Sequence, residues 1–287
     1  MIPVVLAVVL VRETVLAPTP EEPSRSAGSP GVVLHTYDYD AVQPGAEVAG
    51  GEGVWAGEQE PRVDGDPKPN RIRVVAADEA PVGGGEAPSG NVMRVELRPY
   101  DDGDGDVTET DGYRASRAEV FGRQSDESGA PVAEWPDPEG ATRWYSFSVY
   151  LQSPWKFTER SDRWLTLTQW KGARTGRPPV ALELRKDAWR LGGKGGADSL
   201  GKASVDTWVH FDIGLHFSPD PDVGWAEVWM DGEQVLPRTH RATLNTKDGE
   251  TDPAYLKQGI YRSKEWNSTH VAYFGPLTIG TTRESVT

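Results

Sequence analysis

The 287-residue chain contains no cysteine, only five histidines and no apolar segment long enough to cross a bilayer. Without cysteine, neither a disulfide framework nor a thiolate metal site can form. The main apolar run, residues 2–11, is shorter than the roughly 20 residues that a membrane-spanning helix requires. We therefore expect no membrane partner and no fold that depends on disulfides.

Positive charge is also scarce, since 30 Lys and Arg face 44 Asp and Glu, for a net charge of −14. Residues 1–140 carry 11 Lys and Arg against 27 Asp and Glu, whereas residues 141–287 carry 19 against 17. A nucleic-acid-binding protein would show a basic stripe, and none is visible. We predict no nucleic-acid partner. The C-terminal half can still bind an anionic polymer, because the local field matters more than the total charge.

The first 30 residues differ from the rest. Residues 2–11 resemble the apolar part of a signal peptide, with a loose cleavage site at 15–17. No Lys or Arg precedes this run, so a buried strand or a mis-assigned start explains it equally well. Residues 18–30 are rich in Pro, Ser and Glu, which is typical of a linker. We expect residues 1–30 to be a leader or linker, residues 31–287 to form one domain, and the protein to be secreted; a surface or virion tail component is the alternative.

Alternating apolar and polar residues dominate the rest of the chain. In Thr207–Phe217 five apolar residues alternate with Trp, His and Asp, which predicts a half-buried strand. Asp231-Gly232 is a strong hairpin signal, because a type I′ turn needs positive φ at both positions. The residues on either side of this turn, within 224–235, are expected to be the two arms of the hairpin. Further strands are expected at 31–39, 71–77, 91–98, 113–123, 143–151, 163–171, 180–191, 254–262 and 271–281.

No segment shows a sustained helical period, and many short strands between Gly and Pro turns predict an all-β fold, a β-sandwich or jelly roll. Acidic stretches rich in Gly and Pro, near 40–70, 78–90 and 124–140, are expected to be long surface loops. The 11 Trp and 9 Tyr suit both cross-strand packing and stacking on sugar rings, and packing accounts for most of them.

The segment Tyr255–Tyr261 reads Tyr-x-Lys-x-Gly-x-Tyr. Successive side chains of a strand point to opposite faces, so Tyr255, Lys257 and Tyr261 would share one face around Gly259. Two phenols and an ammonium suit a surface that binds an acidic sugar and moves protons. The alternative is an edge strand with exposed aromatics. Glycine inside the strand counts against it, because such a glycine often marks close approach of backbone or ligand.

A second polar row lies in the segment 117–123, where one strand face would hold Arg117, Glu119, Phe121 and Arg123. Charge-assisted hydrogen bonds within the row would hold the guanidinium groups in place. Arg117 could then bind a carboxylate through two parallel hydrogen bonds. The alternative is a solvated ladder of ion pairs.

The third segment, 163–171, places Gln169 and Lys171 on one face, with Leu165 and Leu167 further back on it. A glutamine beside a lysine can hydrogen-bond and neutralise a carboxyl group. Taken alone, the pattern fits a strand end that reaches solvent equally well.

In this order and at these separations, the three segments resemble those of jelly-roll polysaccharide lyases, a group that includes alginate lyases, glucuronan lyases and heparin lyase I. Arg117 and Glu119 match an Arg-x-Glu strand, Gln169 matches a Gln-x-His strand, and residues 255–261 match a Tyr-x-Lys-x-Gly-x-Tyr strand. The resemblance covers residues 31–285. It implies a concanavalin-like jelly-roll β-sandwich with a concave substrate groove. We expect a monomer that requires no cofactor and takes an anionic polysaccharide as its substrate.

The chain departs from the family pattern at Lys171, where the pattern has histidine. Lysine is charged at neutral pH unless burial lowers its pKa. Lys171 therefore neutralises charge, or another histidine supplies the base, or the site is inactive. The histidines are His35, His210, His216, His240 and His270. We expect His35 to be the substitute, because two tyrosines share its strand face.

The reaction that the resemblance implies is β-elimination from a uronic acid. Removing the C5 proton puts negative charge on the adjacent carboxylate, and this charge must be stabilised as it develops. The resemblance assigns that role to Arg117, Gln169 and Lys171. Tyr261 is expected to protonate the leaving O4 and also to act as base, since Lys257 favours the phenolate. The remaining residues expected to contact the substrate are Glu119, Arg123 and Tyr255.

A calcium site is a further hypothesis. Asp102, Asp104 and Asp106 lie in a Gly-rich acidic loop, and closely spaced carboxylates suit a structural Ca²⁺. The twelfth position, counted from Asp102, is Tyr113 instead of the Glu of an EF-hand. An acidic flexible loop is the alternative.

Two other functions remain open from the sequence. A lectin-like sandwich that only binds acidic polysaccharide is one, because fold does not imply function. A glycosidase is the other, and it needs two carboxylates across a sugar; Glu183 and Glu227 are its candidates.

Overall fold

The computed structural model describes residues 30–46, 48, 55–59, 62–63, 66–67, 71–99, 115–125, 131–133, 137–158, 163–172, 176–194, 196–263 and 265–287. In 57–59, 62–63, 66–67, 123–125 and 131–133 it describes the backbone only. Residues Gly31–Thr287 form one compact unit. None of the helices in these ranges is long and apolar enough to cross a membrane.

The regular secondary structure of the described residues is β-strand, apart from three short 3₁₀ turns. The 3₁₀ turns are η1 (Tyr39–Ala41), η2 (Ala77–Glu79) and η3 (Arg283–Ser285). The strands are β1 (Val33–Tyr37), β2 (Gly57–Gln59), β3 (Arg62–Val63), β4 (Asp66–Pro67), β5 (Ile72–Val75), β6 (Val92–Leu97), β7 (Ala115–Phe121), β8 (Arg123–Ser125), β9 (Pro131–Ala133), β10 (Thr142–Leu151), β11 (Leu165–Gly172), β12 (Val180–Arg185), β13 (Ala188–Gly192), β14 (Asp198–Lys202), β15 (Trp208–His216), β16 (Trp225–Met230), β17 (Glu233–His240), β18 (Asn245–Lys247), β19 (Glu250–Asp252), β20 (Ala254–Ser263), β21 (His270–Phe274) and β22 (Leu277–Gly280).

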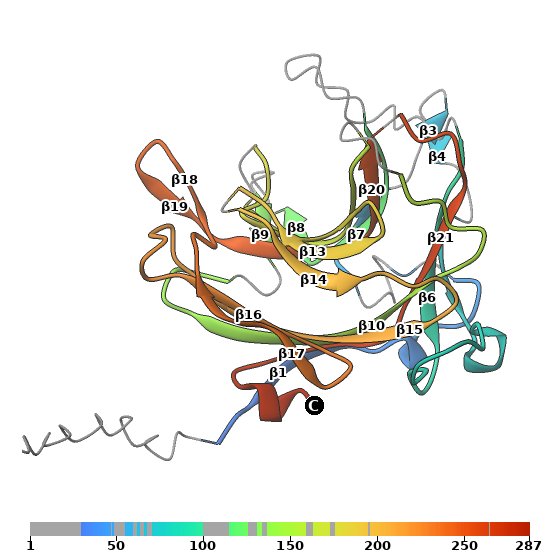
Figure 1. Ribbon diagram of the computed structural model, residues 1–287, viewed down its shortest axis with the longest axis horizontal. Helices are drawn as coiled ribbons and strands as arrows, with labels where there is room; N and C mark the ends of the chain where they lie inside the picture. The colour runs from blue at the N-terminus through green and yellow to red at the C-terminus, as the bar shows by residue number, and fades with distance from the viewer. Residues whose placement is uncertain are drawn as a thin grey trace, which may run out of the picture. The chain divides into compact units, whose positions relative to one another are not determined.

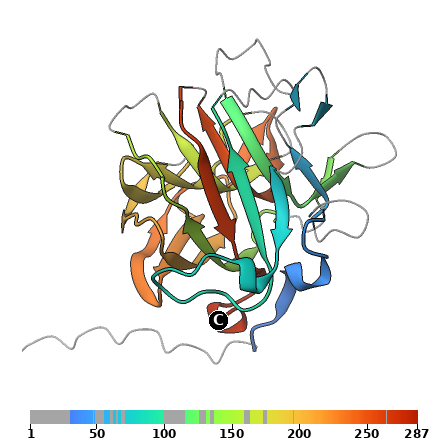
Figure 2. The ribbon, with the colours of Figure 1, turned by 90° about the vertical axis from the view of Figure 1, so that its right-hand side faces the viewer.

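Two large antiparallel sheets form a sandwich (Figure 1). The nine-stranded sheet runs β17-β16-β15-β10-β21-β6-β5, with β22 beside β10 and β1 beside β22. The seven-stranded sheet runs β14-β13-β12-β11-β20-β7-β2. Figure 2 shows β21, β6 and β5 side by side at one end of the nine-stranded sheet. Both sheets bend in the same direction, and the outer face of the seven-stranded sheet lies on the inside of the bend (Figure 1).

Strict alternation in the sequence explains the core between the sheets. In β15 the apolar row Val209, Phe211, Ile213 and Leu215 is buried in the core cluster, as the pattern predicted. Trp189 of the seven-stranded sheet packs its ring edge-on against Phe211, with 5.1 Å between the ring centroids. The all-β sandwich predicted from the sequence is therefore confirmed.

Two of the expected strands are each divided in two. The stretch 180–191 forms the hairpin β12–β13, whose turn residue Lys186 has a φ of 57°. The stretch 271–281 forms β21 and β22, and only β22 pairs with β1. Asp231-Gly232 joins β16 to β17 with φ values of 51° and 80°, as expected for a type I′ turn.

His270 is buried in the sandwich without a charge. Its Nδ1 lies 2.7 Å from Arg262 Nη1, and the rings of Trp155 and Trp266 lie 4.5 and 4.7 Å from its own. Burial and the neighbouring guanidinium lower the pKa of His270 to about 3. The neutral ring thus accepts a hydrogen bond that helps to hold the end of β20 against β21.

Asp137 is a carboxyl group buried beside a phenol. Burial shifts its pKa upward, in the direction opposite to the shift at His270. Tyr145 Oη donates to its Oδ2 at 2.5 Å, and Arg143 Nε lies 3.5 Å from its Oδ1. Burial raises the pKa of Asp137 to about 7, against the weaker opposing effects of the hydrogen bond and of Arg143. Asp137 also pairs through its backbone with Ala254 at the start of β20.

These two groups are expected to change stability with pH in opposite directions. Between pH 3 and 6.5 the unfolded chain holds more protons at His270, so acidification destabilises the fold. Between pH 3.8 and 7 the folded chain holds more protons at Asp137, so acidification stabilises it. We expect the melting temperature to fall less steeply from pH 6.5 to pH 4.5 in His270→Gln than in the wild type, and more steeply in Asp137→Asn. If the dependence of the melting temperature on pH changed in the same direction in both variants, the opposite pKa shifts assigned to His270 and Asp137 would be wrong.

Candidate active site

The register of three neighbouring strands brings the three polar segments onto one face. Tyr261 of β20 lies opposite Arg117 of β7, and Lys257 of β20 lies opposite Gln169 of β11. Glu119 lies opposite Gly259, between these two cross-strand rows. The alternate residues Ala118, Val120 and Ile260 are fully buried in the core. The polar members therefore occupy the outer face of the seven-stranded sheet, which we call the cationic face.

The centre of the cationic face is the carboxylate of Glu119. Its side chain is 0% exposed and accepts hydrogen bonds from Lys257 Nζ at 2.7 Å and Gln169 Nε2 at 2.5 Å. Arg117 Nη1 lies 3.9 Å from the same oxygen that Lys257 contacts. The expectation that Glu119 contacts the substrate directly is wrong for this geometry, because its carboxylate is enclosed by its own partners.

Tyr261 lies beside this cluster and is partly exposed. The guanidinium carbon of Arg117 lies 4.2 Å from the centroid of the Tyr261 ring. Trp164 meets that ring edge-on, with 4.6 Å between the centroids. A cation held over a phenol ring favours negative charge on the ring system. Arg117 and Tyr261 are thus positioned to act together on an anionic ligand.

The ionisation of the buried pair follows from its surroundings. Burial lowers the pKa of Lys257 to about 8, with Arg117 adding to the effect and Glu119 opposing it. Burial alone would raise the pKa of Glu119, but Lys257, Arg117 and Gln169 outweigh it and hold that pKa below its ordinary value. At neutral pH the pair is therefore charged on both members, and Arg117 remains as the cation that faces outward.

Gly259 allows the two central strands to approach closely. Its φ is +144°, and a Cβ built there would lie 2.3 Å from the carbonyl oxygen of Ala118 and 2.7 Å from Glu119 Cα. A side chain at this position would push β20 away from β7. The glycine of the sequence pattern thus marks close backbone contact, and it sets the distance between the strands that carry Tyr261 and Arg117.

A bulge in β11 corrects one detail of the sequence interpretation. The pairing of β11 shifts between Thr166 and Thr168, so alternation does not continue through Leu167. Thr166 lies opposite Tyr261 on the cationic face, whereas Leu165 and Leu167 belong to the core. The expectation that these two leucines share a face with Gln169 is wrong, because one extra residue reverses the direction of every side chain beyond it.

The other predicted site residues lie at varied depths. Lys171 is partly exposed and donates from Nζ to the carbonyl of Gly176 at 2.5 Å. Tyr255 lies opposite Lys171 on the same face and is nearly buried, as are Gln169 and Lys257. The side chain of Arg123 lies outside the described part of the structure. Arg117, Tyr261 and Lys171 are the partly exposed members of this set.

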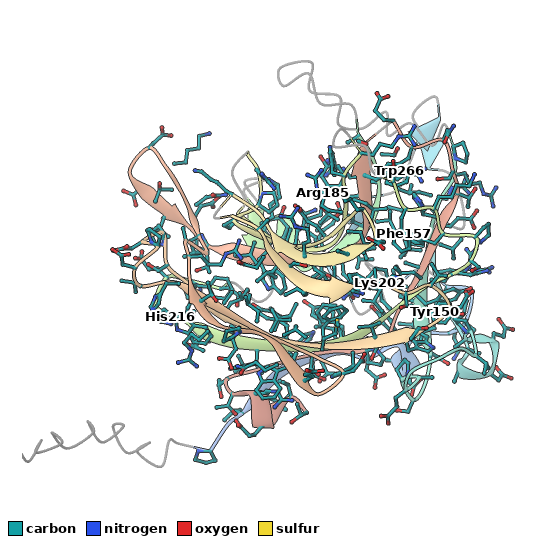
Figure 3. The ribbon with its side chains drawn as sticks, viewed as in Figure 1. Tyr150, Phe157, Arg185, Lys202, His216 and Trp266 are labelled. Carbon is teal, nitrogen blue, oxygen red and sulfur yellow. The ribbon has the colours of Figure 1, made fainter. Side chains whose placement is uncertain are left out.

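None of the five histidines lies on the cationic face. All of them belong to strands of the nine-stranded sheet: His35 to β1, His210 and His216 to β15, His240 to β17 and His270 to β21. Figure 3 shows His216 at that sheet and Arg185 on the outer side of the other. His35 lies opposite Ile279, whose side chain is in the core. The structure thus does not bring His35 to the site, and the expectation that it supplies the base is corrected.

Two further hypotheses are affected by the structure. Asp102, Asp104 and Asp106 lie outside the described residues; within those that are described, no group of three His, Asp or Glu side chains could hold a metal ion. Glu183 lies on β12 and Glu227 on β16, in different sheets. These two carboxylates do not face each other across a substrate, so the geometry gives no support to a glycosidase.

Sequence reasoning missed three residues of the cationic face. Trp164 contacts Tyr261, while Arg185 and Arg190 extend the face across β12 and β13. The alternation in Val180–Arg185 carried a usable signal, since Leu182 and Leu184 are buried on one side and Glu183 and Arg185 lie on the other. Arg190 was hidden because the hairpin turn at 186–187 was read as continuous strand.

The fold and the site together define a β-sandwich with a cationic outer face suited to an anionic ligand. The polysaccharide lyase family profile matches residues 70–277, which is most of the chain. The protein therefore belongs to the polysaccharide lyase family and is a polysaccharide lyase. No curated protein matches the sequence.

Solved structures support the fold. The endo-β-1,4-glucuronan lyase of the fungus Trichoderma reesei is similar, with a TM-score of 0.54 and 15% identity over 81% of this chain and 98% of that one. The alginate lyase Aly36B, solved as a mutant with an alginate tetrasaccharide, gives a TM-score of 0.51 and 12% identity over 87% of this chain and 96% of that one. At these identities the similarity shows a shared β-sandwich fold.

Proposed function

We propose that this lyase cleaves a uronic-acid polymer by β-elimination on the cationic face, with Tyr261 as the proton-transfer residue. The observation that carries the proposal is the cross-strand arrangement of Arg117 over the ring of Tyr261, beside the buried Glu119–Lys257 pair. The substrates named for the two similar structures, glucuronan and alginate, are also uronic-acid polymers.

Charge stabilisation is assigned to Arg117 and Lys171. Loss of the C5 proton moves negative charge onto the uronate carboxylate, and fixed cations lower the free energy of that state. Arg117 and Lys171 are partly exposed and can reach a carboxylate. Gln169 and Lys257 act from beneath, because they hold Glu119 and so keep the positions and charges of the face constant.

Proton transfer is assigned to Tyr261 in both directions. As phenolate it takes the C5 proton, the C5 electron pair forms the C4–C5 double bond, and the C4–O4 bond breaks. The phenol then returns the proton to O4. One residue serves both steps because histidine is absent from this face. The products are a chain with an unsaturated uronate at its new non-reducing end and a second chain with a new reducing end, whose hydroxyl contains O4.

This arrangement restricts the stereochemistry of the substrate. A residue that both removes the C5 proton and protonates O4 meets the sugar from one side, so the two groups must lie on the same side of the ring. D-Glucuronate and D-mannuronate satisfy this condition. L-Guluronate and L-iduronate, with C5 inverted, and D-galacturonate, with C4 inverted, do not. The site therefore favours glucuronate- or mannuronate-type polymers.

The test compares polymers that differ at one carbon. We expect ultraviolet absorbance from the new double bond to grow with glucuronan or polymannuronate and to stay flat with polyguluronate, which differs from polymannuronate only at C5. Equal rates on polymannuronate and polyguluronate would contradict a single proton-transfer residue. Binding without absorbance on every polymer tried, including heparin, heparan sulfate and hyaluronan, would favour the lectin-like alternative.

We further propose that the enzyme acts outside the cell, where such polymers accumulate.

A further inference from the structure

The ring of Tyr261 is contacted from the strands on both sides of β20, which lies between β7 and β11 in the seven-stranded sheet. From β7, the guanidinium carbon of Arg117 lies 4.2 Å from the centroid of the Tyr261 ring. From the other side Trp164, the residue before β11, meets the same ring at an interplanar angle of 69°, with 4.6 Å between the centroids. A tyrosine on an open strand face can adopt more than one staggered rotamer, whereas packing against both groups restricts the ring of Tyr261.

The bulge in β11 brings Trp164 to the cationic face. Had alternation continued unbroken from Gln169, Leu165 would share its face and Trp164 would point into the core. The shift in pairing within residues 166–168 reverses this order. Leu165 therefore lies in the core, and its neighbour Trp164 lies against Tyr261. β-Bulges are common next to active sites, where they redirect a side chain.

The backbone of Trp164 is held by the end of β20 and the residues after it. Its carbonyl oxygen accepts hydrogen bonds from Ser263 N at 3.1 Å and from Trp266 Nε1 at 3.2 Å. Trp266 (Figure 3) is nearly buried, and its ring lies 4.7 Å from the buried ring of His270. The indole of Trp164 therefore starts from a fixed point beside Tyr261, which precedes Ser263 by two residues on β20.

We propose that Trp164 is a positioning residue for proton transfer, which holds the phenol of Tyr261 in the orientation that lets its oxygen reach the sugar. The inference rests on the proposed function, in which one phenol oxygen serves both the C5 hydrogen and O4. Two reacting atoms leave little tolerance for a misplaced catalyst, because a shift of about 1 Å can cost about 10²-fold in rate. Arg117 supplies charge beside the ring, and Trp164, which has no charge, fixes the direction of the ring.

The kinetics of Trp164 variants test this role. We expect Trp164→Ala to lower kcat by roughly 10–10²-fold with little change in KM, because the ring keeps its charged partner and loses its fixed direction. The pH dependence of kcat should not move, since tryptophan does not titrate. Trp164→Phe, which keeps an aromatic edge, should recover most of the rate, and Trp164→Leu, which keeps apolar bulk alone, should not. Trp229→Ala removes a partly exposed tryptophan from β16 in the opposite sheet; it is the matched control and should keep the wild-type rate.

The orientation of the phenol can also be measured without turnover. In protein with isotope-labelled tyrosine rings, NMR reports how fast each ring flips, and the signal of Tyr261 is the one that Tyr261→Phe removes. We expect the Tyr261 ring to flip faster in Trp164→Ala and Trp164→Leu than in the wild type and Trp164→Phe. Melting curves of every variant establish that the fold is intact.

The outcomes separate this inference from the proposed function. If Trp164→Ala keeps its kcat or only raises KM, or if Trp164→Leu is as active as Trp164→Phe, Trp164 does not position the phenol. An unchanged flip rate in Trp164→Ala would overturn the inference as well. If the wild type produces no absorbance from any polymer, or if Tyr261→Phe keeps its rate, the proposed elimination at Tyr261 fails, and the flip rates still show whether Trp164 orients that ring.

Discussion

Replacing Tyr261 by phenylalanine is expected to reduce kcat by about 10²–10⁴-fold, the usual contribution of general acid–base catalysis. The substitution removes one oxygen atom and keeps the ring. The contacts of that ring with Arg117, at 4.2 Å, and with Trp164, at 4.6 Å, are retained. KM and the melting temperature should therefore change little. Initial rates from absorbance of the unsaturated product measure the effect.

Tyr255→Phe is the matched control for this experiment. Tyr255 lies on the same strand and the same face, six positions earlier, but it is nearly buried. We expect it to lose less than about tenfold in kcat, because it makes no proton transfer. If Tyr255→Phe lost as much as Tyr261→Phe, or if Tyr261→Phe retained its rate, the assignment of proton transfer to Tyr261 would be wrong.

Replacing Glu119 by alanine is expected to cost about 3–5 kcal/mol in the free energy of unfolding, as when one partner of a buried ion pair is removed. Lys257 is only 2% exposed, so its ammonium group would lose its carboxylate partner without gaining solvent. Gln169 would lose the acceptor for its amide group as well. For a domain of this size the melting temperature should fall by about 10 °C. Chemical denaturation and thermal melting measure both quantities.

The double variant Glu119→Ala/Lys257→Met separates the destabilisation caused by the unpaired charge from that caused by the lost packing. Removing both charges abolishes the uncompensated ammonium group, and a neutral pair in its place is often no less stable than the ion pair. We expect the double variant to be more stable than Glu119→Ala and still poorly active, because the Glu119–Lys257 pair no longer fixes the position of Arg117. A double variant that is no more stable than the single one would show that the buried charge is not the source of the loss.

The sequence predicted which residues share one strand face, but not how deeply each of them is buried. Tyr255, Lys257 and Tyr261 share a face because period-two alternation survives along β20, and the register with β7 places Arg117 opposite Tyr261. The burial of a side chain depends on which other residues cover it. An alternating sequence pattern carries no information about those residues. Glu119 therefore looked like a surface group although it is enclosed.

The errors in the predicted elements also have physical causes. The bulge at Leu167 reversed the alternation of β11, and the turn at Lys186 divided one expected strand into two. Both depend on local backbone geometry, which a pattern of residue types does not specify. His35 was placed by its neighbours in sequence, whereas its position is set by the pairing of β1 with β22 in the opposite sheet.

The separation of histidines from the cationic face has a physiological consequence. Histidine is the side chain that gains charge in mildly acidic surroundings. Every histidine of this chain lies on the nine-stranded sheet, and the cationic face of the opposite layer owes its positive charge to guanidinium and ammonium groups. The positive charge of the cationic face therefore does not depend on the protonation of a histidine.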